Sequence, residues 1–357
     1  MVLLLFLILV ISAGGGAHAA TPSVWDSIPD SAAAAPDTLA FSDILIRVKH
    51  GSAALRALPY RVTAATALFE QAGAWPNPSV LAEAENVDGS YSGLDQSEFS
   101  LWLSQEFELG GKRSRRMEQA SRAVDEAALE SGTESFAVYL DAKSRYAAVV
   151  HAEERVRLAV DAEGLVASLA RAAGDRVRAG AALTADAALA EAALARTQLA
   201  IDAARAERTS ARVALSALWG EPTGFDDPIA HALPLVRTTL PADSGEAWAA
   251  RSPSVTRLRL ASAARRADAA LEKSLRVPNL TVAAGARRVE ADDASTLLVG
   301  VGLPIPAWDR RGAATRAAEA RGRASEIEID AARASVAGAL VGRIAILAVL
   351  QDRLHKT

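Results

Sequence analysis

No cysteine occurs among the 357 residues of this sequence, and aromatic residues make up only 5% of it. The absence of cysteine excludes disulfide bonds, thiolate metal sites and a lipid-modified N-terminal cysteine. The hydrophobic fraction is nevertheless 50%, and most of it is alanine, which favours long helices packed closely together. The formal net charge is only −4, with acidic and basic residues interleaved along the helical segments, so no nucleic-acid partner is predicted.

The sequence also lacks the motifs of common enzymes and metal sites. It contains no nucleophile elbow, phosphate loop or HExxH pattern. The histidines beyond residue 20 show no metal-ligand spacing from one another: His50, His151, His231 and His355. We therefore predict that the chain is not an enzyme and has no catalytic residues, no cofactor and no metal site of its own.

The N-terminal residues 1–20 are typical of a secretory signal peptide. An apolar run over 2–11 is followed by small residues and an Ala-His-Ala cleavage site at 17–19. The run is shorter than the roughly 20 residues that span a bilayer, which favours cleavage over anchoring. Residues 21–40, rich in Ser, Pro, Asp and Ala, are predicted to form a flexible N-terminal lead.

After this lead, the sequence repeats one unit of helix, strand, strand and helix. Placing Pro78 on Pro278 superimposes two copies with a shift of about 200 residues. The first copy covers 41–220, a linker in the equatorial region covers 221–243, and the second copy covers 244–357. The predicted helices span 41–74 with a kink at Pro59, 111–173, 184–218, 244–276 and 312 onward, and the predicted strands span 79–86, 97–109, 278–288 and 296–303.

The predicted strand over 97–109 has one apolar and one polar face. Phe99, Leu101 and Leu103 share one parity, as in membrane-spanning strands of about 9 to 11 residues. Four such strands cannot leave their edges open in lipid, so we expect three copies of the chain to close a twelve-stranded barrel. The polar parity carries three carboxylates that are predicted to face the lumen, either to favour cations or only to keep it wet: Glu98, Glu106 and Glu108.

Basic residues cluster where each copy changes from strand to helix. We interpret them as marking the inner boundary of the membrane, where they contact anionic headgroups; the alternative is a solvated helix face. Positive charge in the first turn of a helix is unfavourable, which predicts compensating partners nearby. The residues are Lys112, Arg113, Arg115, Arg116, Arg310 and Arg311.

These junctions, LSQEFELGGKRSRR over 103–116 and VGLPIPAWDRRG over 301–312, resemble those of TolC-like outer-membrane efflux proteins of the cobalt-zinc-cadmium resistance branch. The segment RVRAGAALTAD over 176–186 is similar to the family's helical tip. The resemblance implies an α+β membrane fold, in which long α-helical hairpins form a periplasmic tunnel and each protomer adds four β-strands to a trimeric barrel. The second copy ends before a second tip, which predicts a C-terminally truncated chain.

The resemblance further implies a location in the outer membrane with a periplasmic extension. It implies a homotrimer in outer-membrane lipid, a periplasmic adaptor (a membrane fusion protein) and an inner-membrane RND transporter as partners, and a passive duct for heavy-metal cations. Two alternatives remain open: a soluble periplasmic coiled-coil scaffold or adaptor, and a nonfunctional truncated fragment. The implied residues for adaptor docking and the aperture are Arg178, Gly180, Leu183 and Asp186, for the last of which helix capping is the alternative.

Overall fold

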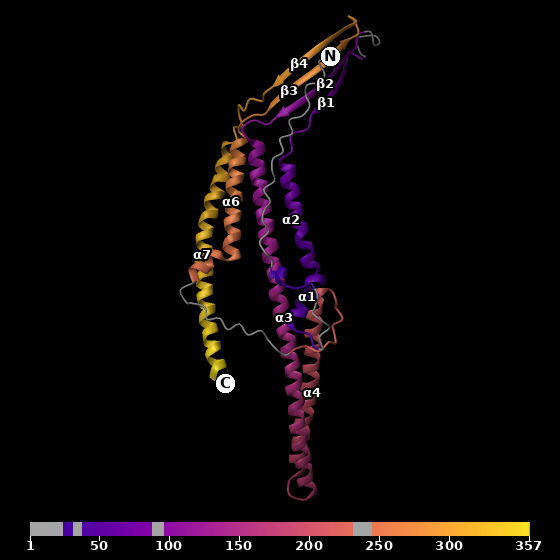
Figure 1. Cartoon of the computed structure of the whole chain (residues 1–357), viewed down its shortest axis with the longest axis vertical. Helices are drawn as coiled ribbons and strands as arrows, with labels where there is room; N and C mark the ends of the chain where they lie inside the picture. The colour runs from indigo at the N-terminus through magenta and orange to yellow at the C-terminus, as the bar shows by residue number, and fades with distance from the viewer. Residues whose placement is uncertain (1–23, 31–37, 88–95, 231–244, 357) are drawn as a thin grey trace.

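The computed structural model describes residues 24–30, 38–87, 96–230 and 245–356, with side chains described as far as residue 349. The predicted signal peptide and the predicted linker beyond residue 230 lie outside the described residues. Figure 1 shows an elongated molecule with a β-sheet at one end and a helical hairpin at the other.

The hairpin consists of α3 (Lys112–Arg178) and α4 (Thr184–Ser216), followed by the short 3-10 helix η2 (Ala217–Trp219). With 67 residues, α3 is about 100 Å long at 1.5 Å per residue. The helix continues through Gly174, where the sequence predicted its end, and the chain turns instead at Gly180, whose φ is +71°. A glycine tolerates this left-handed backbone, so the turn lies where no side chain opposes it.

The helices preceding each pair of strands are interrupted at serine residues. In the first copy, α1 (Phe41–Gly51) and α2 (Ala53–Ala72) are separated by Ser52, whose hydroxyl accepts a hydrogen bond from the Leu55 N–H at 3.5 Å. The single helix predicted over 41–74 is divided at Ser52, whose extended backbone ends α1 and whose hydroxyl caps α2. Pro59 lies inside α2, and the kink predicted there stays a prediction.

The second copy has the same interruption. Ser252 separates α5 (Gly245–Arg251) from α6 (Pro253–Ser274) and accepts from the Val255 N–H at 3.3 Å. Pro253 follows at the first helical position, where its missing N–H is harmless. The final helix α7 (Gly312–Lys356) has no such interruption and packs along both α6 and α5.

The sheet contains β1 (Ser79–Glu85), β2 (Glu98–Phe107), β3 (Leu280–Val289) and β4 (Ala294–Gly302). All neighbours are antiparallel in the order β1-β2-β3-β4, so β2 of the first copy pairs directly with β3 of the second. Together with the long hairpin, this four-stranded antiparallel sheet confirms the predicted α+β architecture of long helices and four strands.

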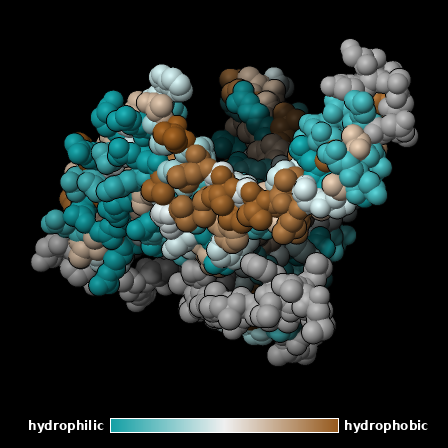
Figure 2. Space-filling view, turned by 90° about the horizontal axis from the view of Figure 1, so that it is seen from above, coloured by the Kyte–Doolittle hydropathy of each residue, from teal (hydrophilic) through white to brown (hydrophobic). Residues whose placement is uncertain are grey.

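One face of the sheet is apolar and exposed. The register places Val80, Leu103, Ala284 and Val299 in one row across the four strands on this face. Leu101 is 56% exposed and Leu297 is 81% exposed. Viewed from the sheet end, brown hydrophobic side chains form a continuous band across the molecule (Figure 2). A large exposed apolar surface of this kind marks contact with lipid or with another protein.

The main hydrophobic core lies beside the middle of α3, where α1, η1 (Val24–Ser27) and η2 meet it. Trp25 is buried there and donates its indole N–H to the Ser135 carbonyl at 2.9 Å. This contact corrects the prediction that the whole N-terminal lead is flexible, because the tryptophan of the lead packs into the hydrophobic core. The core residues are Trp25, Leu39, Ile44, Leu45, Val48, Ala142, Tyr146, Val149, Val150, Leu215, Trp219, Phe225 and Ile229.

Gly51, the last residue of α1, has no room for a side chain. A Cβ at this position would lie 2.7 Å from the Cβ and 2.9 Å from the Cα of Trp219. We expect Gly51→Ala to lower the free energy of unfolding by about 2 kcal/mol through overpacking, measured by thermal loss of the helical circular dichroism signal in detergent. Gly132→Ala in α3 is the control, since nothing lies within 4 Å of its Cβ. Equal unfolding temperatures for the two variants contradict the predicted clash.

Candidate functional site

Gly110 and Gly111 make the turn from β2 into α3. Both have φ of +74°, a left-handed backbone that favours glycine. A Cβ on Gly110 would lie 2.8 Å from the Val277 side chain, so the turn also passes close to the segment that follows α6. The double glycine therefore sets the direction of α3 and brings the two copies into contact.

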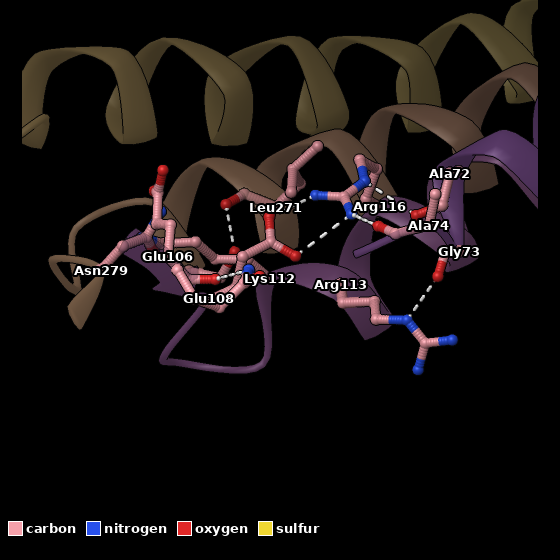
Figure 3. A network of polar contacts seen from close by, with 12 residues as sticks. Ala72, Gly73, Ala74, Glu106, Glu108, Lys112, Arg113, Arg116, Leu271 and Asn279 are labelled. Atoms are coloured by element: carbon pink, nitrogen blue, oxygen red, sulfur yellow. Dashed lines mark hydrogen bonds and ion pairs between the residues drawn. The ribbon is translucent and has the colours of Figure 1, made fainter. Parts of the chain in front are cut away.

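Arg116 of α3 joins the first helix pair to the end of the strand segment. Its Nε and Nη2 donate to the carbonyl oxygens of Ala72 and Ala74 at 2.8 and 3.0 Å, and its Nη1 lies 2.5 Å from Oε1 of Glu108 (Figure 3). The end of a helix leaves carbonyl groups without intrahelical partners. The guanidinium supplies that partner to α2 and neutralises the Glu108 carboxylate, whose side chain is only 9% exposed.

Arg113 contacts the same end of α2. Its Nε donates to the Gly73 carbonyl at 2.6 Å, and its guanidinium lies 5.4 Å from the ring centroid of Trp75. Two arginines at the start of α3 thus bind the carbonyl end of α2. They account for the compensating partners that the sequence predicted for positive charge in a first helical turn.

Lys112 is buried and connects the two copies. Its Nζ donates to Oδ1 of Asn279, and Nδ2 of Asn279 in turn donates to the Glu106 carboxylate. Burial lowers the pKa of the Lys112 ammonium, while the Glu108 and Glu106 carboxylates oppose the shift and the Arg311 guanidinium adds to it. The Lys112–Asn279–Glu106 chain is therefore an internal polar link between α3 and the start of β3.

The remaining basic residues of the junctions lie further out. Arg115 pairs with Glu118 at 2.8 Å along the exposed side of α3, and Arg311 pairs with Glu272 of α6 at 3.3 Å. Arg310 is exposed. Lys112, Arg113 and Arg116 are thus engaged with the protein itself, and headgroup contact by any of the six stays a prediction.

The three predicted lumen carboxylates all have partners. Glu98 pairs with Arg287 of β3 at 2.9 Å, Glu106 accepts from Asn279, and Glu108 is held by Arg116. Glu108 lies beyond β2, which ends at Phe107 because the chain turns toward the double glycine; this differs from its predicted place on a strand. The pairing leaves less net negative charge on this face than the sequence predicted.

At the tip, the side chains stabilise the turn between α3 and α4. Oδ2 of Asp186 accepts from the Leu183 N–H at 3.2 Å, which is the capping arrangement held open as the alternative for this residue. Arg178 pairs with Asp175, and both side chains remain largely exposed. The Leu183 side chain is also exposed, so the tip presents an apolar residue and a paired arginine around Gly180.

Sequence reasoning did not identify Asn279, Glu272 or Arg287 as partners of the junction residues. Asn279 was visible only as the start of a strand, and its role depends on the register of β2 against β3, which no local pattern reveals. Within the described part of the chain, no group of three or more His, Asp or Glu side chains is arranged to hold a metal ion.

The family model described as "Outer membrane efflux protein" matches residues 47–221. The match covers just under half of the chain. The predicted resemblance to outer-membrane efflux proteins is confirmed by this match, and a location in the outer membrane with a periplasmic extension stays a prediction. The family consists of efflux components and not of enzymes.

Three curated relatives carry metal-resistance names. The cobalt-zinc-cadmium resistance protein CzcC of Cupriavidus metallidurans is 31% identical over 57% of this chain and 49% of its own length. The nickel-cobalt-cadmium resistance protein NccC of Alcaligenes xylosoxydans is 29% identical over 76% of this chain and 62% of its own. The nickel and cobalt resistance protein CnrC of Cupriavidus metallidurans is 28% identical over 87% and 74%. This chain therefore spans about half the length of CzcC and under two thirds of NccC.

Solved structures of the same fold include the outer-membrane channel OprN and the outer membrane protein VceC of Vibrio cholerae. OprN has a TM-score of 0.67 at 20% identity and covers 88% of this chain and 76% of its own. VceC has a TM-score of 0.68 at 17% identity and covers 88% and 80%. At these identities the likeness establishes the fold of the chain.

The Arg116 contacts predict a large effect of its removal. Arg116→Met leaves the Glu108 carboxylate nearly buried without a cation and the end of α2 without donors, so we expect about 3 kcal/mol lower unfolding free energy. Arg115→Met is the matched control, because its exposed pair with Glu118 contributes at most about 1 kcal/mol. Thermal unfolding in detergent, followed by circular dichroism, measures both. A loss no larger than that of the control contradicts the role assigned to Arg116.

Proposed function

We propose that three copies of this chain form an outer-membrane channel that acts as the passive duct of a tripartite heavy-metal efflux system. The observation that carries the proposal is the sheet. Among the described residues, β1 and β4 each pair on one side only, and the face that includes Leu101 and Leu297 is apolar and exposed. In lipid, open strand edges must find partners, and β4 of one protomer can pair with β1 of the next protomer.

The proposed substrate class rests on the names of the curated relatives. CzcC, NccC and CnrC are named for resistance to cobalt, zinc, cadmium and nickel. In this proposal the cations are cargo. The chain supplies a polar, water-filled path, and the choice of metal belongs to the inner-membrane RND transporter.

The periplasmic adaptor is proposed to bind the tip formed by Arg178, Gly180, Leu183 and Asp186. An exposed leucine beside a glycine turn offers an apolar contact and a backbone that a partner helix can approach closely. The capping role of Asp186 is compatible with a position at the aperture, since only one carboxylate oxygen is engaged with the Leu183 N–H.

The membrane boundary is proposed to lie at the two strand-to-helix junctions, one in each of the two repeats, 41–220 and 244–357. Trp308 supports this level, because it is 97% exposed and precedes Arg310 and Arg311 by two and three residues. Exposed tryptophan followed by arginine suits the interface between hydrocarbon and headgroups. The alternative, a soluble scaffold, does not explain the exposed tryptophan or the exposed apolar face of the sheet.

The proposal is tested with the full chain expressed in a host that has a metal-exporting adaptor and transporter but lacks their outer-membrane component. We expect a heat-sensitive trimer in the outer-membrane fraction on unheated gels, and restored tolerance to cobalt, zinc or cadmium. Recovery only as a soluble monomer overturns the channel. A membrane trimer that forms channels but restores no metal tolerance overturns the substrate class alone.

The tip is tested by Gly180→Val. A β-branched residue at φ of +71° costs about 1–2 kcal/mol per residue and forces the turn to change, so we expect metal tolerance to be lost while the trimer persists. Gly174→Ala in the last turns of α3 is the control, because nothing lies within 4 Å of its Cβ and its φ is not positive. Unchanged metal tolerance in Gly180→Val contradicts the proposal that the adaptor binds at the tip.

A further inference from the structure

The polar face of the sheet is interrupted by one apolar row that crosses all four strands. The register aligns Leu81 of β1 with Trp102 of β2, Trp102 with Gly285 of β3, and Gly285 with Leu298 of β4. These residues lie on the parity of Glu98 and Ser104, opposite the exposed face that contains Leu101 and Leu297. They are therefore not part of the apolar surface proposed to contact lipid.

The rows on either side are polar or small. On one side, the register aligns Glu83, Ser100, Arg287 and Thr296, and Arg287 is held by Ser100 Oγ at 3.0 Å and by Glu98. The row on the other side consists of Ser79, Ser104, Ala283 and Gly300. The apolar row is thus a single band on an otherwise hydrophilic wall.

Gly285 decides how the Trp102 indole lies in this band. A Cβ on Gly285 would be 2.7 Å from the backbone carbonyl oxygen of Leu101 and 2.9 Å from both Cδ2 and Cε3 of Trp102, and a Cβ on Gly300 would be 3.9 Å from Cζ3 of Trp102. The indole therefore lies across β3 toward β4, against the sheet, in the space that a side chain at Gly285 would fill. Aromatic rings commonly cover cross-strand glycines in this way.

We propose that, in the trimer of the proposed function on which this inference rests, the row Leu81–Trp102–Gly285–Leu298 forms an apolar collar around the barrel lumen, and that Gly285 sets its width. With the indole against the wall, the lumen stays wide. The collar also offers a passing cation no ligand. Conduction requires that ions leave each site as readily as they enter it, and an apolar zone without binding groups meets that need.

The width of the collar is tested by unitary conductance of the purified full-length trimer in planar lipid bilayers. Gly285→Val places two methyl groups where the indole lies and turns it into the lumen, so we expect conductance to fall by about twofold or more. Adding Trp102→Ala to Gly285→Val leaves the close approach to the Leu101 carbonyl oxygen in place but removes the displaced indole, so conductance is expected to return to at least the parent value. Gly300→Ala is the control, since its Cβ meets only ordinary contacts at 3.8 Å or more and leaves the indole in place.

The position of the collar has a separate test that leaves Gly285 unchanged. Leu81→Glu adds a carboxylate per subunit to the row, and the reversal potential in a salt gradient is expected to shift toward cation selectivity, whereas Leu81→Gln produces no shift. Unchanged conductance in Gly285→Val, or failure of Trp102→Ala to restore it, overturns the width-setting role. An unchanged reversal potential in Leu81→Glu overturns the collar, even where Gly285→Val does not assemble. If the parent protein forms no trimer or channel, it is the proposed function that fails.

Discussion

The pairing of β2 with β3 holds the two halves of the molecule together. Nearly half of the chain lies between these strands, yet their antiparallel register runs from Glu98 opposite Val289 to Phe107 opposite Leu280. Once this register forms, the start of α3 and the end of α6 lie side by side beneath the sheet, and the Asn279 amide comes within reach of both Lys112 and Glu106. The arrangement of the helices therefore depends on the register of one strand pair.

The change from strand to helix is the second constraint, because it must redirect the chain without leaving polar groups unsatisfied. The left-handed glycines at 110 and 111 supply the turn, and the arginines of the first helical turns supply donors to the end of α2. A positive charge near a helix N-terminus is unfavourable in isolation. Here the unfavourable position is offset because the same guanidinium groups bind carbonyl oxygens and a carboxylate.

Local sequence patterns predicted the elements well and their partners poorly. Alternation of Phe99, Leu101 and Leu103 gave the strand and its apolar face, because period-two alternation is a property of the strand alone. The break at Ser52 was not predicted, because a serine cap depends on the extended backbone that the residue adopts, which the sequence does not show. The partners of Glu98 and Lys112 lie in the other copy, and no spacing within one copy identifies them.

The serine interruptions also affect how the helical part responds to force. Ser52 and Ser252 divide one helix in each copy, whereas α3 and α7 run past those positions without a break. Each repeat therefore packs a helix interrupted at a serine against a continuous helix. The helix segments on either side of each serine can rotate relative to one another, because backbone hydrogen bonding is not continuous there. The continuous helices α3 and α7 resist bending. Torsion applied at the hairpin end is thus transmitted toward the sheet mainly through α3.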